Sequence, residues 1–98
     1  MEKRTAHYPL AEIKKLVKDG HVHATKAALA GAAELDYTLD DMIYVVENLE
    51  TEDLHKSMTS YENDELWQDV YRYPAVEAEI YLKLQIVDKA VIISFKER

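Results

Sequence analysis

The strongest constraint on how this chain folds is a change of hydrophobic period about halfway along it. From residue 76 to residue 96 apolar and polar side chains alternate almost without a break, except at Asp88-Lys89. Side chains that alternate with a period of two lie on opposite faces of a β-strand. The pattern therefore predicts two strands, 76–87 and 90–96, in an antiparallel hairpin. The residues expected to face the core are Leu82, Leu84, Ile86, Val91, Ile93 and Phe95.

The register of this hairpin follows if Asp88-Lys89 forms a two-residue loop, which places Val87 opposite Ala90. A slip of one residue would turn the apolar side chains outward, so the alternation favours this register. The predicted pairs on the core face are Leu82–Phe95, Leu84–Ile93 and Ile86–Val91. The predicted pairs on the reverse face are Tyr81–Lys96, Lys83–Ser94 and Gln85–Ile92.

Two shorter alternating segments, 56–61 and 67–72, precede this hairpin. A five-residue loop between them predicts the pairs Lys56–Arg72 and Ser60–Gln68. Trp67 and Tyr71 have the opposite alternation and are expected in the core rather than as stacking platforms for bases. The polar side chains of the two hairpins then form one candidate set: Lys56, Gln68, Arg72, Tyr81, Lys83 and Lys96. Tyrosine and lysine are also common on an ordinary solvated sheet face, so alternation alone leaves both interpretations open.

The first half of the chain has helical spacing instead. It predicts three helices, at 10–17, 25–35 and 39–49, and a short turn at 51–54. Asp19-Gly20 is a typical helix stop, and Thr38 with Asp41 resembles a capping arrangement. Helices followed by antiparallel strands predict an α+β fold. We expect one domain, residues 1–98, with the N-terminal helices packed on one face of a C-terminal antiparallel sheet.

Composition excludes several classes of protein. The chain has no cysteine, which rules out disulfides and thiolate chemistry. His21 and His23 offer two metal ligands without an obvious third, so neither a metal nor a cofactor is expected. No apolar run reaches the roughly 18 residues that a membrane span needs, and the N-terminus lacks the apolar core of a signal peptide. We therefore expect a cytoplasmic protein that does not contact a membrane.

The net charge of −7 argues against a general nucleic-acid binder. The charge is unevenly distributed, because residues 31–55 contain eight acidic and no basic residues, whereas residues 1–30 contain six basic and three acidic ones. The two ends of the chain thus keep cations that could form a local patch. Direct DNA binding is not expected, since no predicted helix carries lysine and arginine along a readable face.

Several of these segments together resemble one known family. They are MEKRT at 1–5, LHKSMTSY at 54–61, WQDVYR at 67–72, YLK at 81–83 and SFKE at 94–97. The set resembles the motility quorum-sensing regulator (MqsR) toxins of bacterial toxin–antitoxin pairs, over essentially the whole chain. Two features depart from the family pattern. Arg72 is followed by Tyr73-Pro74 rather than directly by proline, and the net charge is acidic.

The resemblance implies a RelE-like fold and a metal-independent mRNA interferase that cuts free or ribosome-bound messages at short GC-containing sites. It further implies inhibition of translation and growth, and control by a cognate MqsA-like antitoxin that would supply any operator binding. The catalytic set of the family falls on Lys56, Gln68, Tyr81 and Lys96. Further candidates for contacts with RNA are Arg72, Lys83 and His55.

A ribonuclease without a metal can use the 2′-hydroxyl of RNA as nucleophile, which leaves a 2′,3′-cyclic phosphate and a 5′-hydroxyl. In our hypothesis Tyr81 is the base, since Lys96 and Lys83 would favour its phenolate form. Lys56 and Lys96 would neutralise charge on the phosphate, and Gln68 would orient the phosphate or a base. His55 is a second candidate for proton transfer, because imidazole titrates near neutrality.

The alternative is a non-catalytic RelE-like protein that only binds an antitoxin or the ribosome. The acidic net charge favours this alternative. Toxicity on expression separates the two, because only the ribonuclease is expected to be toxic.

Overall fold

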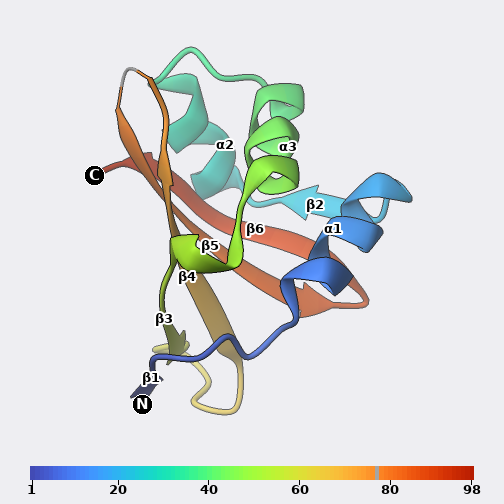
Figure 1. Cartoon of the computed structure of the whole chain (residues 1–98), viewed down its shortest axis with the longest axis vertical. Helices are drawn as coiled ribbons and strands as arrows, with labels where there is room; N and C mark the ends of the chain where they lie inside the picture. Colours follow the sequence, from blue (N-terminus) through green and yellow to red (C-terminus); the bar gives the residue numbers. More distant parts are fainter. Residues whose placement is uncertain (77) are drawn as a thin grey trace.

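The computed structural model describes residues 1–76 and 78–98 and has the predicted α+β architecture (Figure 1). The helical elements are α1 (Leu10–Lys18), α2 (Lys26–Ala33), α3 (Leu39–Asn48) and the 3₁₀ turn η1 (Thr51–Asp53). The strands are β1 (Glu2–Lys3), β2 (Val22–Ala24), β3 (Leu54–Thr59), β4 (Trp67–Pro74), β5 (Glu79–Val87) and β6 (Lys89–Glu97). The strand predicted at 76–87 begins at Glu79 instead, and residue 77 lies outside the described residues.

The helices begin and end where local chemistry dictates. Helix α1 starts after Pro9 and ends at Lys18, with Asp19 as its C-cap. Gly20 follows with φ 82°, a left-handed conformation that glycine adopts without strain. The side chain of Thr38 accepts a hydrogen bond from the Asp41 amide at 3.2 Å. The Asp41 carboxylate in turn accepts one from the Thr38 amide at 2.8 Å. This reciprocal pair confirms the capping box predicted for α3.

The sheet has the strand order β1-β3-β4-β5-β6-β2. All neighbours are antiparallel except β2 and β6, which run parallel. The prediction of a wholly antiparallel sheet was therefore wrong at one edge. Strands β1 and β2, of two and three residues, were not predicted because segments this short show no alternation.

The β5–β6 register agrees with the prediction near the chain end and departs from it near the turn. Tyr81 faces Lys96, Leu82 faces Phe95 and Lys83 faces Ser94, as predicted. A β-bulge after Lys83 then shifts the register by one. The remaining observed pairs are Leu84–Ile92, Gln85–Val91, Ile86–Ala90 and Val87–Lys89.

The bulge changes which side chains enter the core. Ala90 and Ile92 are buried, whereas Val91 and Ile93, which were predicted to face the core, are only half-buried. The turn contains one residue rather than two: Asp88, with φ 65°. The predicted pairs Leu84–Ile93, Ile86–Val91 and Gln85–Ile92 are therefore wrong.

The β3–β4 register is shifted by two residues from the prediction. Lys56 faces Val70 instead of Arg72, and Met58 faces Gln68 instead of Ser60. A shift of two keeps every side chain on its predicted face, because the period of a strand is two. A further irregularity between Leu54 and Lys56 makes His55 an extra residue in β3.

The buried side chains of the three helices form one cluster with those of a single face of the sheet. The strand contribution includes Tyr71, Ile80, Leu82, Ile92 and Phe95. Helix α2 approaches β6 closely at Gly31, where a Cβ atom would lie 1.9 Å from the Phe95 carbonyl oxygen. Helix α2 thus lies against the backbone of the strand that carries Lys96. None of the helices in the described part of the chain is long and apolar enough to cross a membrane.

Candidate functional site

The predicted polar side chains lie on the sheet face opposite the buried core. We call this the polar face and define it by Lys56, Gln68, Arg72, Tyr81, Lys83 and Lys96. Their strand neighbours Ser57, Asp69, Tyr71, Leu82 and Phe95 are buried on the other side. Tyr81 and Lys96 therefore share one face, as the sequence predicted.

The polar face is organised in rows across the strands. One row contains Arg72, Tyr81 and Lys96, which are direct neighbours on β4, β5 and β6. The next contains Lys56, Val70, Lys83 and Ser94. Gln68 lies a further row away, opposite Met58. Rows on one face are about 7 Å apart, so Gln68 lies about 13 Å along β4 from Arg72.

Tyr81 is surrounded by cationic and aromatic side chains. The ring of His55 lies with its centroid 5.8 Å from that of Tyr81. The guanidinium carbons of Arg72 and Arg98 lie 5.7 and 5.9 Å from the Tyr81 ring centroid. The extra residue in β3 brings His55 to the end of this row. The structure thus gathers His55, Arg72 and Lys96 around Tyr81.

Glu79 connects the two arginines beside Tyr81. Its Oε1 accepts a hydrogen bond from Arg72 Nε at 2.7 Å, and its Oε2 lies 3.5 Å from Arg98 Nη1. The hydrogen bond from Arg72 lowers the pKa of Glu79, and the same bond raises the pKa of Arg72. Glu79 and Arg72 are therefore both charged at neutral pH.

Lys56 forms an ion pair with Glu2 of β1. The hydrogen bond and the charge of Lys56 lower the pKa of Glu2. A phosphate that binds Lys56 would therefore compete with this carboxylate.

The protonation state of His55 follows from its surroundings. Burial lowers the pKa of His55, and the positive charges of Arg72, Lys56, Arg4 and Arg98 lower it further. The imidazole is therefore neutral at pH 7, with one nitrogen free to accept a proton.

Trp67 and Tyr71 lie on the same face of β4, on the side opposite the polar face, but they are buried to different degrees. Tyr71 is 1% exposed, and burial raises its pKa to about 12, which confirms its predicted core position. Trp67 is half-buried and lies outside the main core, so its predicted core position was wrong. His7 stacks on its ring at 5.4 Å, and Lys3 Nζ lies 4.2 Å from the ring centroid. The N-terminal segment thus covers the Trp67 ring through His7 and Lys3.

Basic side chains are concentrated on the polar face, whereas most acidic residues of the middle of the chain lie in the helices and in η1, which reaches the cavity beside Arg72. The acidic stretch 31–55 forms the end of α2, the whole of α3 and η1. The polar face, by contrast, carries Lys56, Arg72, Lys83, Lys96 and Arg98. A chain with an acidic net charge therefore presents a locally cationic surface around Tyr81.

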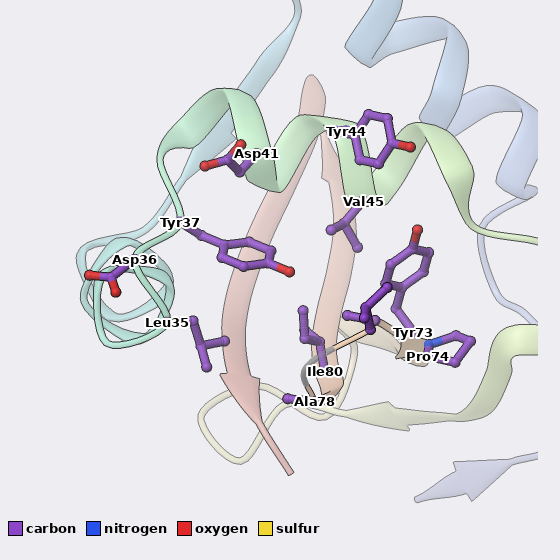
Figure 2. A pocket seen from close by; sticks show the side chains of 12 residues that line it. Leu35, Asp36, Tyr37, Asp41, Tyr44, Val45, Tyr73, Pro74, Ala78 and Ile80 are labelled. Carbon is purple, nitrogen blue, oxygen red and sulfur yellow. The ribbon is translucent and has the colours of Figure 1, made fainter.

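Two cavities flank β4 and β5. A cavity of about 310 Å³ adjoins the Tyr81 cluster. It is lined by Glu52, Asp53, Leu54, His55, Arg72, Pro74 and Glu79. A larger cavity of about 680 Å³ lies beside α3, where Tyr37 and Tyr73 point into it (Figure 2). Its described lining residues include Asp36 and Asp41 but no basic residue and none of the predicted site residues. The larger cavity therefore offers no cation for a phosphate among those residues, whereas Arg72 lines the smaller one.

Sequence reasoning missed Glu79 and Arg98, although the predicted register places them opposite each other. The Arg98 amide donates a hydrogen bond to the Glu79 carbonyl at 2.9 Å, as that register requires. His21 and His23 acquire no third ligand: among the described residues, no three His, Cys, Asp or Glu side chains are grouped to hold a metal ion.

Comparison with known proteins agrees with the resemblance drawn from the motifs. The family described as "Motility quorum-sensing regulator, toxin of MqsA" matches residues 5–97. The mRNA interferase toxin MqsR of Escherichia coli (strain K12) is 45% identical over 98 residues, which span the full length of both chains. A match of this length and identity shows that the chain belongs to the MqsR toxin family.

Proposed function

We propose that this chain is the toxin of a toxin–antitoxin pair, with a RelE-like fold, and that it cleaves mRNA in the cytoplasm as a metal-independent endoribonuclease. The proposal includes selectivity for short GC-containing sites, with inhibition of translation and growth as the result. The 45% identical relative, an mRNA interferase toxin, supports it. The observation that carries it is the position of Tyr81 beside Lys96, among further cations on one face of the sheet.

The proposed reaction begins at the 2′-hydroxyl of the RNA. A base removes its proton, and the oxygen attacks the adjacent phosphorus. The 5′-oxygen leaves and receives a proton, which gives a 2′,3′-cyclic phosphate and a 5′-hydroxyl. The protein must supply a base, an acid and positive charge around the phosphorane oxygens.

Tyr81 is the proposed centre of proton transfer. Lys96 lies directly across from it, and Lys56 and Lys83 lie in the adjacent row. In this proposal Lys96 and Lys56 neutralise the negative charge that develops on the reacting phosphate. Arg72 and Lys83 contact the RNA backbone on either side of it. His55 can exchange a proton with Tyr81 or act as the base itself, because a neutral imidazole has both a donor and an acceptor.

Gln68 takes a different role in this proposal. Its row is too far from Tyr81 for both side chains to contact one phosphate. An amide that donates and accepts is suited to the edge of a nucleobase, so we assign Gln68 to a neighbouring nucleotide.

The proposed partner that silences the activity is an MqsA-like antitoxin, as the family description names. We assign any operator binding to that antitoxin rather than to this chain. The rival proposal, a binding-only protein, drew on the acidic net charge. It loses part of that support because most of the acidic stretch lies in α2 and α3 rather than on the polar face, although Glu52 and Asp53 of η1 line the cavity beside Arg72.

The test is a set of three variants, Tyr81→Phe, Lys96→Ala and Lys56→Ala, assayed on RNA after a check of folding. We expect each to slow cleavage at least about a hundredfold. Lys89→Ala, an exposed lysine at the β5–β6 turn, is the matched control and should cleave normally. Wild-type rates in all three variants would exclude the proposed site. A wild-type chain that binds RNA without cutting it would favour the binding-only alternative.

A further inference from the structure

Glu79 and Arg98 have no role in the chemistry described above, and they form a cluster with Arg72. Glu79 and Arg72 come from the adjoining ends of β5 and β4, and Arg98 directly follows β6. One carboxylate contacts both guanidinium groups, at 2.7 Å and 3.5 Å. Both guanidinium groups also lie within 6 Å of the Tyr81 ring centroid. A single acidic side chain thus sets the position of two cations beside the proposed catalytic tyrosine.

The cluster keeps the capacity to bind an anion. A guanidinium group has five N–H donors, and Glu79 engages one nitrogen of Arg72 and one of Arg98. The side chains of Arg72 and Arg98 are 40% and 59% exposed, so solvent and a ligand can reach them. Two arginines held side by side match the oxygens of a phosphodiester better than two free side chains do.

The Glu79 carboxylate also has an electrostatic cost, because it cancels part of the positive charge of the polar face. A residue that served only bulk attraction for RNA would not be acidic at this position. The benefit must therefore come from geometry, since a fixed guanidinium loses less conformational freedom when it binds.

We propose that Glu79 is a positioning residue, and that it holds Arg72 and Arg98 as a guanidinium pair that binds the RNA phosphate next to the one that is cleaved. This inference rests on the proposed ribonuclease function. It also adds Arg98 to the residues that contact RNA. Glu79 itself touches no reacting atom and acts through the two arginines.

The inference predicts opposite effects on binding and on rate. Glu79→Ala removes a negative charge, so affinity for RNA should stay equal or rise, with a steeper dependence on salt. The same change releases both arginines, so the cleavage rate at saturating RNA should fall between about tenfold and a hundredfold. A purely structural residue would instead weaken binding and rate together as the fold is lost.

The experiment uses the full chain and an RNA oligonucleotide that contains a mapped cleavage site. Affinity is measured on the same oligonucleotide with a 2′-deoxy nucleotide at that site, which cannot be cut, over a range of salt concentrations. Rate is measured in single turnover with the all-RNA form. Glu79→Gln, which keeps one acceptor for Arg72, should lie between wild type and Glu79→Ala. Glu97→Gln, an exposed carboxylate on β6, is the control and should change neither quantity.

Arg98→Ala completes the design. It should weaken binding and lower the salt slope by about 0.7, the value for one phosphate contact on a single strand. Combined with Glu79→Ala, it should slow cleavage no further than Glu79→Ala alone, because both act through one pair. An unchanged or faster rate in folded Glu79→Ala would overturn the inference, as would weaker binding in a folded Glu79→Gln.

The same assay on Tyr81→Phe separates this inference from the function on which it rests. If Tyr81→Phe is inactive and the Glu79 variants cleave normally, only the role of Glu79 is rejected. If Tyr81→Phe, Lys96→Ala and Lys56→Ala all cleave at the wild-type rate, the site and the role of Glu79 are both rejected.

Discussion

Tyr81 and Lys96 lie directly opposite each other on β5 and β6, on the sheet face that points away from the core. This part of the hairpin lies on the regular side of the bulge that follows Lys83. The two side chains are therefore fixed by strand pairing rather than by a loop. Opposed positions place their Cβ atoms about 4.5–5.5 Å apart, within reach of a shared phosphate.

The first prediction concerns the Tyr81 hydroxyl. Tyr81→Phe removes one oxygen and keeps the ring between Arg72 and Arg98, so the free energy of unfolding should change by less than about 0.5 kcal/mol. The single-turnover cleavage rate should fall between about a hundredfold and ten-thousandfold, the range for loss of a general acid or base. Tyr61→Phe, at a residue 98% exposed, is the control. A Tyr81→Phe rate within twofold of wild type would contradict the assignment.

The second prediction concerns pH and His55. Its pKa in the folded protein lies below the usual value of about 6.5, because burial and the charges of Arg72, Lys56, Arg4 and Arg98 oppose protonation, while Tyr81 is its aromatic neighbour. Between these two values the unfolded chain binds more protons than the folded one. The free energy of unfolding should therefore fall as pH drops from about 6.5 toward the folded pKa.

The measurement is urea unfolding between pH 7.5 and pH 5, in wild type and in His55→Gln. The wild-type chain should lose more stability over this interval than the variant does. His23→Gln, an exposed histidine of β2, should leave the wild-type pH profile intact. Identical profiles for wild type and His55→Gln would show that His55 titrates alike in both states.

The third prediction concerns the Glu2–Lys56 pair. Glu2→Gln leaves the Lys56 ammonium without its carboxylate, so it should tighten binding to an uncleavable RNA by about threefold at physiological salt. The affinity is measured by titration at several salt concentrations, with Glu62→Gln in the exposed β3–β4 loop as the control. Weaker binding in Glu2→Gln would mean that the carboxylate positions Lys56 instead of competing with RNA.

The fourth prediction concerns the buried carboxylate of Asp69. It accepts hydrogen bonds from the backbone amides of His7 and Tyr8, at 2.9 to 3.1 Å, and so ties the N-terminal segment to β4. Asp69→Ala leaves these amides without an acceptor and should lower the free energy of unfolding by about 2–3 kcal/mol. Asp69→Asn keeps one acceptor oxygen, so its free energy of unfolding should fall by less than that of Asp69→Ala.

Denaturant unfolding followed by tryptophan fluorescence is a suitable measurement, because Trp67 packs against the segment that Asp69 holds. Asp64→Ala, in the exposed loop, should leave stability unchanged. Equal stability of Asp69→Ala and wild type would show that the N-terminal segment contributes little to the fold.

The sequence was sufficient to place the polar face because a register error of two residues keeps side-chain parity, whereas the one-residue shift at the bulge moved Val91 and Ile93 out of the core. The β3–β4 pairing was wrong by two residues, yet Lys56 and Gln68 stayed on the predicted face. Tyr81 and Lys96 were paired correctly because both lie beyond the bulge. Within a strand segment that contains no bulge, alternation therefore predicts the face of a side chain more reliably than the residue paired with it on the neighbouring strand.

The length of the turn in the last hairpin could not be predicted from side-chain alternation. A two-residue turn of type I′ needs a positive φ at both positions, which aspartate tolerates and lysine does not. The chain instead turns on Asp88 alone, and the register shift between Lys83 and Leu84 takes up the difference. Strands β1 and β2 were also missed, since their pairing partners lie more than 50 residues away in the sequence.

Those two short strands lie at the outer edges of the sheet. β1 pairs with β3, the strand of Lys56, and β2 pairs with β6, the strand of Lys96. Without them, β3 and β6 would present bare backbone donors and acceptors, which invite pairing with other chains. The first 24 residues thus cover both outer strands, and we expect a chain that lacks them to associate through the exposed edges of β3 and β6.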